Sequence, residues 1–440
     1  MFSAKKLILF AAIFCAAFAA ANLILFELHK LGLNFHYIPS WPINVFGPSE
    51  MTRHYRLLVS LALLAVFFVA QRLLAKVDYR LPLVIIAGFA LIIGSNLIQG
   101  FEEGFADPIT ADEFNDEQTP QYYHDAVEIT DAGEFFRNYN ALQPTLHMHA
   151  RTHPPGPVVL IYALNKALKE PALISLLIAA VAVTSAAWFF YKLLVTEFQP
   201  RLAGFMTFIF LLLPSVQIYY LATVDALLAA LLLGVFYCFK RATALHLFSA
   251  AALLTLSFML TFLTVWMIPV LFGYALIKRQ NTLRASALVL AVMALYGAIY
   301  FASGFNLLAS FRTASAIENE HGFMLLHNPL DYFVSRLQSI GEVMLFFGPY
   351  LCLLFVRSVR GSQRHIATWL ALGSFALLLA AGTFRVGETA RICNFLYPFL
   401  LLPIARYLNQ RNATEAEKAQ LAWLVFGQTI LMQAAGSYFW

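Results

Sequence analysis

Residues 245–277, LHLFSAAALLTLSFMLTFLTVWMIPVLFGYALI, form an apolar stretch without Asp, Glu, Lys or Arg. An α-helix rises about 1.5 Å per residue, so the stretch would be about 50 Å long as a single helix. The hydrocarbon core of a bilayer is only about 30 Å thick. The stretch therefore predicts two short membrane spans in succession.

Similar apolar blocks recur along the whole chain. Of its 440 residues, 60% are hydrophobic and 12% are charged, against about 45–50% and about 25% in soluble domains. This composition excludes a soluble globule and predicts an all-α polytopic membrane protein. All four cysteines lie within apolar blocks, so we expect neither a disulfide framework nor a CxxC metal site; they are Cys15, Cys238, Cys352 and Cys393.

The basic residues predict the topology. They flank apolar blocks in ones and twos, which is typical of cytoplasmic turns and not of a nucleic-acid-binding surface, although the net charge is +5. With Lys5 and Lys6 inside, residues 7–26 are expected to form an uncleaved first span. An even number of crossings must separate neighbouring basic turns. This parity predicts about thirteen spans in a single integral membrane domain, residues 1–440, with the C-terminus outside.

Residues 99–172 are predicted to form a large extracytoplasmic loop between the third and fourth spans. By parity, residues 158–168 do not cross the membrane and are expected to form a helix at the outer interface. Residues 99–154 hold 11 of the 24 acidic residues. Side chains at helical spacing indicate that the loop folds against the membrane face; they are Phe135, Phe136, Tyr139, Leu142 and Leu146.

Two polar clusters lie within this loop. The first, in ADEFNDEQTPQYYHDAVEI (residues 111–129), places carboxylates beside tyrosines; its members are Asp112, Glu113, Asp116, Glu117, Asp125, Tyr122 and Tyr123. Clustered carboxylates raise one another's pKa or hold a divalent cation such as Mg²⁺ or Mn²⁺, and either outcome suits a general base. The second cluster contains His147, His149, Arg151 and His153. Transition-metal binding, phosphate binding and interface packing all remain open for it.

Two further polar sites, Asp225 and the turn at residues 385–391, are predicted to face the same side. Asp225 stands where the fifth span meets the sixth, and its alternative role is to cap the sixth helix. Glu388 and Arg391 are three residues apart and are expected to pair on one helical face. A second arginine in the same turn, Arg385, favours an anion site there.

Three stretches of the chain together resemble a known family. They are THPPGPVVLIYALNKAL (residues 152–168), TEFQPRLAG (residues 196–204) and LLPSVQIYYLATVDALLA (residues 212–229). With the acidic loop before them, they resemble GT-C fold glycosyltransferases, in the branch that includes protein mannosyltransferases and aminoarabinose transferases. The resemblance covers residues 99–239, with a weaker similarity over residues 387–398. It implies a GT-C-like bundle whose active site lies in the first large outer loop.

The resemblance also implies roles for individual residues. The family's acidic motif falls on Asp116 and Glu117 ahead of Tyr122, with Asp125 as an alternative base. The proline motif falls on residues 153–156. The chain departs from the family pattern in two ways: Pro120 and an added residue separate the acidic pair from the tyrosine, and three spans precede the loop where the family usually has one. These departures put the choice of base in doubt.

The sequence thus predicts a glycosyltransferase that moves a sugar from a polyprenyl-phosphate donor to a hydroxyl or amine of a glycan, lipid or protein acceptor. The short turns favour a bacterial inner membrane, with the active site facing the periplasm. The predicted catalytic residues are Asp116, Glu117 and Asp125; the predicted donor-phosphate ligands are Arg151, His153, Arg385 and Arg391; the supporting residues are Asp112, Glu113, Tyr122, Tyr123, His149, Asp225 and Glu388. Two alternatives are a transporter or flippase of a lipid-linked saccharide, indicated by Asp225 and Glu342, and a polymerase or ligase of surface polysaccharide.

Overall fold

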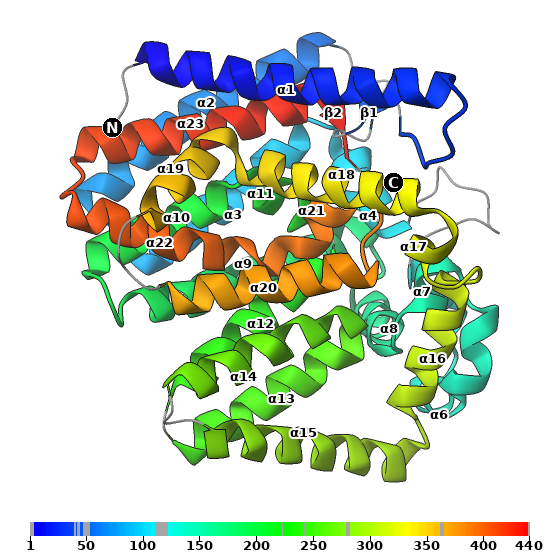
Figure 1. The fold of residues 1–440 in the computed structure, drawn as a ribbon. Helices are drawn as coiled ribbons and strands as arrows, with labels where there is room; N and C mark the ends of the chain where they lie inside the picture. The colour runs from blue at the N-terminus through cyan, green and yellow to red at the C-terminus, as the bar shows by residue number, and fades with distance from the viewer. Residues whose placement is uncertain are drawn as a thin grey trace. The chain divides into compact units, whose positions relative to one another are not determined.

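The computed structural model describes residues 4–38, 41, 45–46, 53–110, 122–221, 223–241, 243–278, 282–360 and 365–438. Figure 1 shows that helices make up almost all of this chain. The described strands are β1 (Val45–Phe46) and β2 (Gly436–Ser437), which pair antiparallel. The predicted all-α class is therefore confirmed.

Several helices have the length and the apolar composition that a membrane span needs. Among the described residues, four helices meet both conditions: α1 (Ala4–Lys30), α2 (Arg53–Lys76), α9 (Pro171–Leu194) and α15 (Thr282–Ser303). Other apolar helices are shorter, at 10–17 residues. These helices agree with an integral membrane protein, whereas the count of about thirteen spans stays a prediction.

The chain divides into two compact units, which are described separately. The first comprises residues 1–100, 190–219 and 321–438. Besides α1, α2 and the end of α9, its helices are α3 (Leu81–Leu97), α10 (Pro200–Leu212), α11 (Pro214–Tyr219), α17 (Met324–His327), α18 (Pro329–Phe347), α19 (Pro349–Val359), α20 (Ile366–Ala381), α21 (Thr389–Ile392), η4 (Cys393–Phe395), α22 (Tyr397–Gln410) and α23 (Glu415–Ala435).

Helix α10 forms the centre of the first unit. It is apolar on every face, and all its residues from Leu202 to Leu212 are buried against α3, α22 and α23. A helix with this composition has no face suited to water, so its neighbours must surround it. A Cβ added at Gly204 would lie 2.1 Å from the carbonyl oxygen of Tyr79, so only glycine allows this close approach.

A sharp bend separates α18 from α19 in the same unit. The two helices meet at 98°. Gly348 stands at the bend with a φ of +100°, which only glycine adopts without strain, and Pro349 begins α19. Residues 329–359 therefore form a broken apolar segment instead of one straight helix.

The second unit comprises residues 101–189 and 220–320 of the described chain. Besides the start of α9 and α15, its helices are η1 (Glu102–Ala106), α4 (Asp107–Thr110), α5 (Tyr122–Glu128), α6 (Ala132–Leu142), η2 (Gln143–Thr145), α7 (Met148–Thr152), α8 (Gly156–Leu168), α12 (Val224–Lys240), α13 (Ala244–Leu260), η3 (Phe262–Trp266), α14 (Met267–Lys278) and α16 (Leu307–Glu318). The predicted outer loop, residues 99–172, supplies η1 to α8.

The apolar stretch 245–277 is not a single helix. Its first part is α13 and its second part comprises η3 and α14. Thr261 adopts an extended conformation between them, with φ −161° and ψ 146°, and its side chain accepts a hydrogen bond from the N–H of Leu263. The predicted division into two helices is thus confirmed, and whether each half crosses the membrane stays a prediction.

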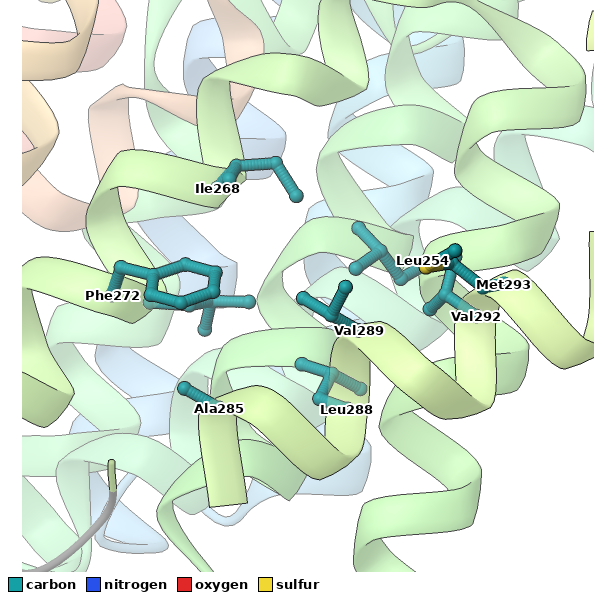
Figure 2. A pocket seen from close by; sticks show the side chains of 9 residues that line it. Leu254, Ile268, Phe272, Ala285, Leu288, Val289, Val292 and Met293 are labelled. Carbon is teal, nitrogen blue, oxygen red and sulfur yellow. The ribbon is translucent and has the colours of Figure 1, made fainter. Parts of the chain in front are cut away.

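Helices α13, α14 and α15 enclose a small apolar cavity, which Figure 2 shows from close by. Its volume is about 90 Å³, and its lining includes Leu254, Phe272 and Met293. No titratable side chain lines it. This cavity is a packing defect between helices and offers no chemistry.

Candidate functional site

The loop helices of the second unit pack on a hydrophobic core of their own. Helix α6 begins at the N-cap residue Asp131, whose carboxylate accepts a hydrogen bond from the N–H of Glu134 at 2.7 Å. This hydrogen bond lowers the pKa of Asp131. Phe135 and Tyr139 lie on the buried face of α6, in one core with Ala126 and Ile161. The predicted amphipathic helix is therefore confirmed, and it holds the polar segments around it in place.

Asp125 and His147 form a close pair within this loop. Nδ1 of His147 lies 2.9 Å from a carboxylate oxygen of Asp125, and the backbone N–H of His147 donates to both oxygens at 3.3 Å. The side chain of Asp125 is 4% exposed, whereas that of His147 is 24% exposed. An ionised carboxylate only accepts hydrogen bonds, so Nδ1 carries the proton and Nε2 is the basic nitrogen of the ring. The pair thus combines a buried carboxylate with a reachable imidazole.

The rings of Tyr122, His149 and His153 lie next to one another. Tyr122 contacts His153 edge-on, with ring centroids 5.6 Å apart, and its centroid lies 5.8 Å from that of His149. Nδ1 of His153 lies 2.8 Å from the carbonyl oxygen of His149. Of the predicted residues, the structure therefore brings together one tyrosine and two histidines.

Two further predicted side chains lie near this group. The hydroxyl of Tyr123 donates to Asn165 at 3.5 Å. Arg151 is half-buried, and its Nε has no hydrogen-bond partner among the described residues. This nitrogen is itself buried, so an anion that binds Arg151 must contact the outer nitrogens of the guanidinium.

Tyr139 and Gln143 donate hydrogen bonds to backbone carbonyl oxygens within residues 147–153, which we call the histidine segment. The hydroxyl of Tyr139 lies 2.8 Å from the carbonyl oxygen of Ala150 and 2.5 Å from that of His153. Burial raises the pKa of Tyr139, so its hydroxyl stays protonated and can donate. Gln143 donates to the carbonyl oxygen of Arg151 at 3.0 Å. The sequence places Tyr139 only on an apolar face, because helical spacing shows which face a side chain occupies and not which groups its hydroxyl bonds.

The predicted break at Pro154 and Pro155 is confirmed. Both prolines are buried, and α8 begins at Gly156 immediately after them. A Cβ added at Gly156 would lie 2.2 Å from the carbonyl oxygen of Met259 in α13. Glycine is therefore required where α8 and α13 approach each other, which fixes the histidine segment to a helix of the apolar bundle.

The predicted arginine turn belongs to the first unit. Arg391 pairs with Glu388 at 3.3 Å, as expected from their spacing, and both side chains are mostly buried. The carboxylate of Glu342 in α18 accepts hydrogen bonds from the N–H groups of Gly387, at 2.6 Å, and Thr389, at 3.0 Å. Arg385 lies in the same turn, between α20 and α21. Most of the charge in this turn is thus matched within the unit.

The alternative role of Asp225, to cap the sixth span, is excluded. The N-cap of α12 is Thr223, whose side chain accepts a hydrogen bond from the N–H of Ala226 at 3.3 Å. A cap residue needs an extended backbone, which Thr223 has with φ −93° and ψ 139°, whereas Asp225 already lies within the first helical turn. There its negative charge faces the positive end of the helix dipole.

Four predicted acidic residues lie outside the described part of the chain: Asp112, Glu113, Asp116 and Glu117. Within the part that is described, no three His, Cys, Asp or Glu side chains lie close enough to hold a metal ion. His147 and His153 each direct Nδ1 to an oxygen of the protein itself.

An apolar groove adjoins this site in the same unit. Its volume is about 630 Å³, and it lies between α13, η3, α15 and the start of α16; it is lined by Phe258, Phe262, Val265, Val292, Met293, Tyr296, Gly297, Tyr300, Phe305, Asn306, Leu307, Leu308 and Phe311. The hydroxyl of Tyr296 donates to the carbonyl oxygen of Thr255 at 3.0 Å, so it is already paired. The ring of Phe305 packs edge-on against Tyr139, with centroids 5.8 Å apart. The groove therefore suits a hydrocarbon chain and reaches the residue that supports the histidines.

The described site thus offers a buried carboxylate, a reachable imidazole, a half-buried guanidinium and a neighbouring apolar groove. This set can bind an anionic group attached to a hydrocarbon chain and can accept a proton beside it. No protein-family model matches the chain, and a search of curated proteins finds no match either.

Proposed function

We propose that the protein is an integral membrane glycosyltransferase of the GT-C type, with about thirteen spans. It moves a sugar from a polyprenyl-phosphate donor to a hydroxyl or amine of a glycan, lipid or protein acceptor, on the periplasmic side of a bacterial inner membrane. The observation that carries this proposal is the Asp125–His147 pair beside the half-buried Arg151, directly ahead of the proline motif. A base and a cation next to an apolar groove are what such a donor and acceptor require.

The donor is proposed to bind through its phosphate and its tail. A lipid phosphate lies at headgroup level, where cations must meet it, and its isoprenoid chain needs an apolar surface. Arg151 and His153 supply the cations in the second unit, and the groove beside Phe305 suits the chain. Arg385 and Arg391 stay proposed phosphate ligands on the strength of the sequence. A divalent cation held by the acidic segment 112–117 also stays a proposal.

The chemistry needs few groups. Glycosyl transfer passes through an oxocarbenium-like state as the bond from the anomeric carbon to the phosphate oxygen breaks. The acceptor loses its proton as its oxygen or nitrogen bonds to that carbon. The leaving lipid phosphate is already an anion and can be matched by arginine, so a general acid is unnecessary. From the sequence, the candidates for the proton acceptor are the loop carboxylates Asp116, Glu117 and Asp125.

One observation favours the alternative of a transporter. Transporters contain broken helices with ionisable groups near the break, and α18 carries Glu342 shortly before its 98° bend into α19. Both oxygens of this carboxylate, however, accept backbone hydrogen bonds, from Gly387 and Thr389. Glu342 therefore holds a turn in place, which is a structural role, and the transferase remains the better proposal.

The proposal is tested with purified protein in detergent, where no gradient can drive transport. We would supply polyprenyl-phosphate mannose and polyprenyl-phosphate aminoarabinose, with water as the default acceptor, and measure the release of polyprenyl phosphate. Release from either donor supports the transferase. The absence of release from both, together with movement of a lipid-linked saccharide across proteoliposomes, would establish the transporter instead.

A further inference from the structure

We propose that Nε2 of His147 is the proton acceptor of the transfer reaction and that Asp125 is its positioning residue. The proposal rests on the proposed function and deepens it, because the sequence placed the base among the carboxylates themselves. Three observations support it: the geometry of the Asp125–His147 pair, the greater exposure of the His147 side chain, and the contacts of the neighbouring His124.

The carboxylate of Asp125 is committed to His147. One oxygen accepts from Nδ1 at 2.9 Å, and both oxygens accept from the backbone N–H of the same residue at 3.3 Å. The side chain of Asp125 is also 4% exposed, against 24% for His147. A general base must come within hydrogen-bond reach of the proton that it removes. Of the two side chains, His147 meets this condition better.

The imidazole of His147 is held in one orientation. The same carboxylate binds both its ring and its backbone N–H, and His147 is also the N-cap of α7, which Gln143 and Tyr139 hold by its carbonyl groups. The described residues provide no partner for Nε2. A carboxylate that orients an imidazole through Nδ1 fixes the tautomer in which Nε2 is basic, and it stabilises the imidazolium that forms.

The nearest histidine, His124, has a different partner. The ring centroid of His124 lies 5.8 Å from that of His147, but Nε2 of His124 is directed at the carbonyl oxygen of Thr110 at 2.7 Å. A nitrogen that pairs with a carbonyl oxygen carries a proton and cannot accept one. Of the two histidines, His147 is the one whose ring pairs with a carboxylate, which can stabilise the imidazolium that a general base becomes.

Nε2 of His147 takes the proton of the acceptor hydroxyl while the hydroxyl oxygen bonds to the anomeric carbon of the sugar. The bond between that carbon and the phosphate oxygen breaks, and its electron pair leaves on the polyprenyl phosphate. His147 becomes an imidazolium whose Nδ1–H faces the Asp125 carboxylate, and it later returns its added proton to water.

The test compares His147→Asn with the wild type on polyprenyl-phosphate mannose and polyprenyl-phosphate aminoarabinose. The amide nitrogen of asparagine can still donate to Asp125, but the side chain lacks the basic Nε2. We expect the release of polyprenyl phosphate with water as acceptor to fall about 100- to 10,000-fold, the range of general base catalysis. His246→Asn is the matched control, because His246 is a half-buried histidine of the same unit that pairs with Thr243 through Nδ1 at 2.6 Å.

Azide separates a base from a structural group. It is an anion that attacks the anomeric carbon without losing a proton, and it yields a glycosyl azide and polyprenyl phosphate. We expect His147→Asn to form the glycosyl azide at close to the wild-type rate. Loss of the azide reaction to the same extent as the water reaction would overturn the proposal, as would full activity with water.

Asp125 is tested through its coupling to His147. Because it is proposed to act through the imidazole, Asp125→Asn combined with His147→Asn should be no slower with water than His147→Asn alone. An additive loss would show that Asp125 acts independently of His147, which contradicts its positioning role. A wild-type protein that releases no polyprenyl phosphate would instead contradict the proposed function itself.

Discussion

Two short polar segments were predicted to bind the same anion, and they differ in how their charges are matched. In residues 385–391, Glu388 pairs with Arg391 and Glu342 accepts hydrogen bonds from the backbone. In residues 147–153, the carboxylate of Asp125 matches only one side of the His147 ring, and the His147 side chain is 24% exposed, against 14% for Arg391 and 13% for Glu388. A segment whose charges are matched internally stabilises the fold, whereas one with charges left over can act on a ligand.

The largest expected effect contrasts the carboxylates of the two segments. We expect Asp125→Asn to lower the rate of polyprenyl-phosphate release at least about 100-fold, because the imidazole loses the anion that orients it and stabilises its protonated form. Its midpoint of thermal unfolding should change little, because asparagine has nearly the same shape. Rates and unfolding midpoints measured on one preparation check both expectations. A wild-type rate in Asp125→Asn would remove the distinction between the segments.

Glu342 should show the opposite behaviour. Glu342→Ala leaves the N–H groups of Gly387 and Thr389 without their acceptor, and a buried unsatisfied donor costs about 1–3 kcal/mol. We expect the free energy of unfolding to fall by about 3 kcal/mol, measured by denaturant titration in detergent, while the protein that remains folded keeps its transfer rate. Glu342→Gln retains one acceptor oxygen and should lose less. A folded Glu342→Ala protein that has lost transfer would show that this carboxylate takes part in the chemistry.

The contrast between the segments also shows what the sequence could predict. The apolar blocks, the helix on Phe135 and Tyr139, the break at Pro154 and the Glu388–Arg391 pair all follow from local spacing. Such patterns span a few residues, so a helix period or a proline reveals them. The Asp125–His147 pair joins positions 22 residues apart, and it depends on how α5, α6 and α7 fold back on one another. No local period contains that information.

The capping role considered for Asp225 could not be settled from local spacing either. The chain offers Thr223 and Asp225 as two good capping residues, and only the backbone angles decide which of them precedes the helix. The sequence also left metal, phosphate and packing open for the histidine segment, because the direction of each ring nitrogen depends on tertiary contacts. The structure shows that Nδ1 of His147 and of His153 pairs with protein oxygens.

A smaller effect is expected when a substitution fills the apolar groove next to the histidine segment. A Cβ added at Gly297 has no heavy atom within 4 Å, so a larger side chain at this position would fill the groove without a clash. We expect Gly297→Phe to raise the KM for a long-chain polyprenyl-phosphate donor about tenfold, which corresponds to about 1.4 kcal/mol. Gly297→Ala is the control and should leave KM unchanged. An equal rise in KM for a donor with a single isoprene unit would show that the groove does not hold the chain.

The smallest expected effect is the loss of stability when the hydroxyl of Tyr139 is removed. Tyr139→Phe removes the hydroxyl that contacts the carbonyl oxygens of Ala150 and His153, and we expect the free energy of unfolding to fall by about 1 kcal/mol near pH 7. This difference in the free energy of unfolding becomes smaller in alkali. Burial raises the pKa of Tyr139 above its ordinary value of 10.0, so above pH 10 the unfolded chain loses this proton while the folded chain keeps it.

The wild type therefore loses stability as the pH rises above 10, and the phenylalanine variant lacks this contribution. Denaturant titrations at pH 7 and at pH 10.5 should show the difference between the two proteins shrinking with pH. A difference that stays constant would mean that Tyr139 titrates normally in the folded protein. Its hydroxyl would then be solvated, and no buried hydrogen bond from Tyr139 would hold the histidine segment in place.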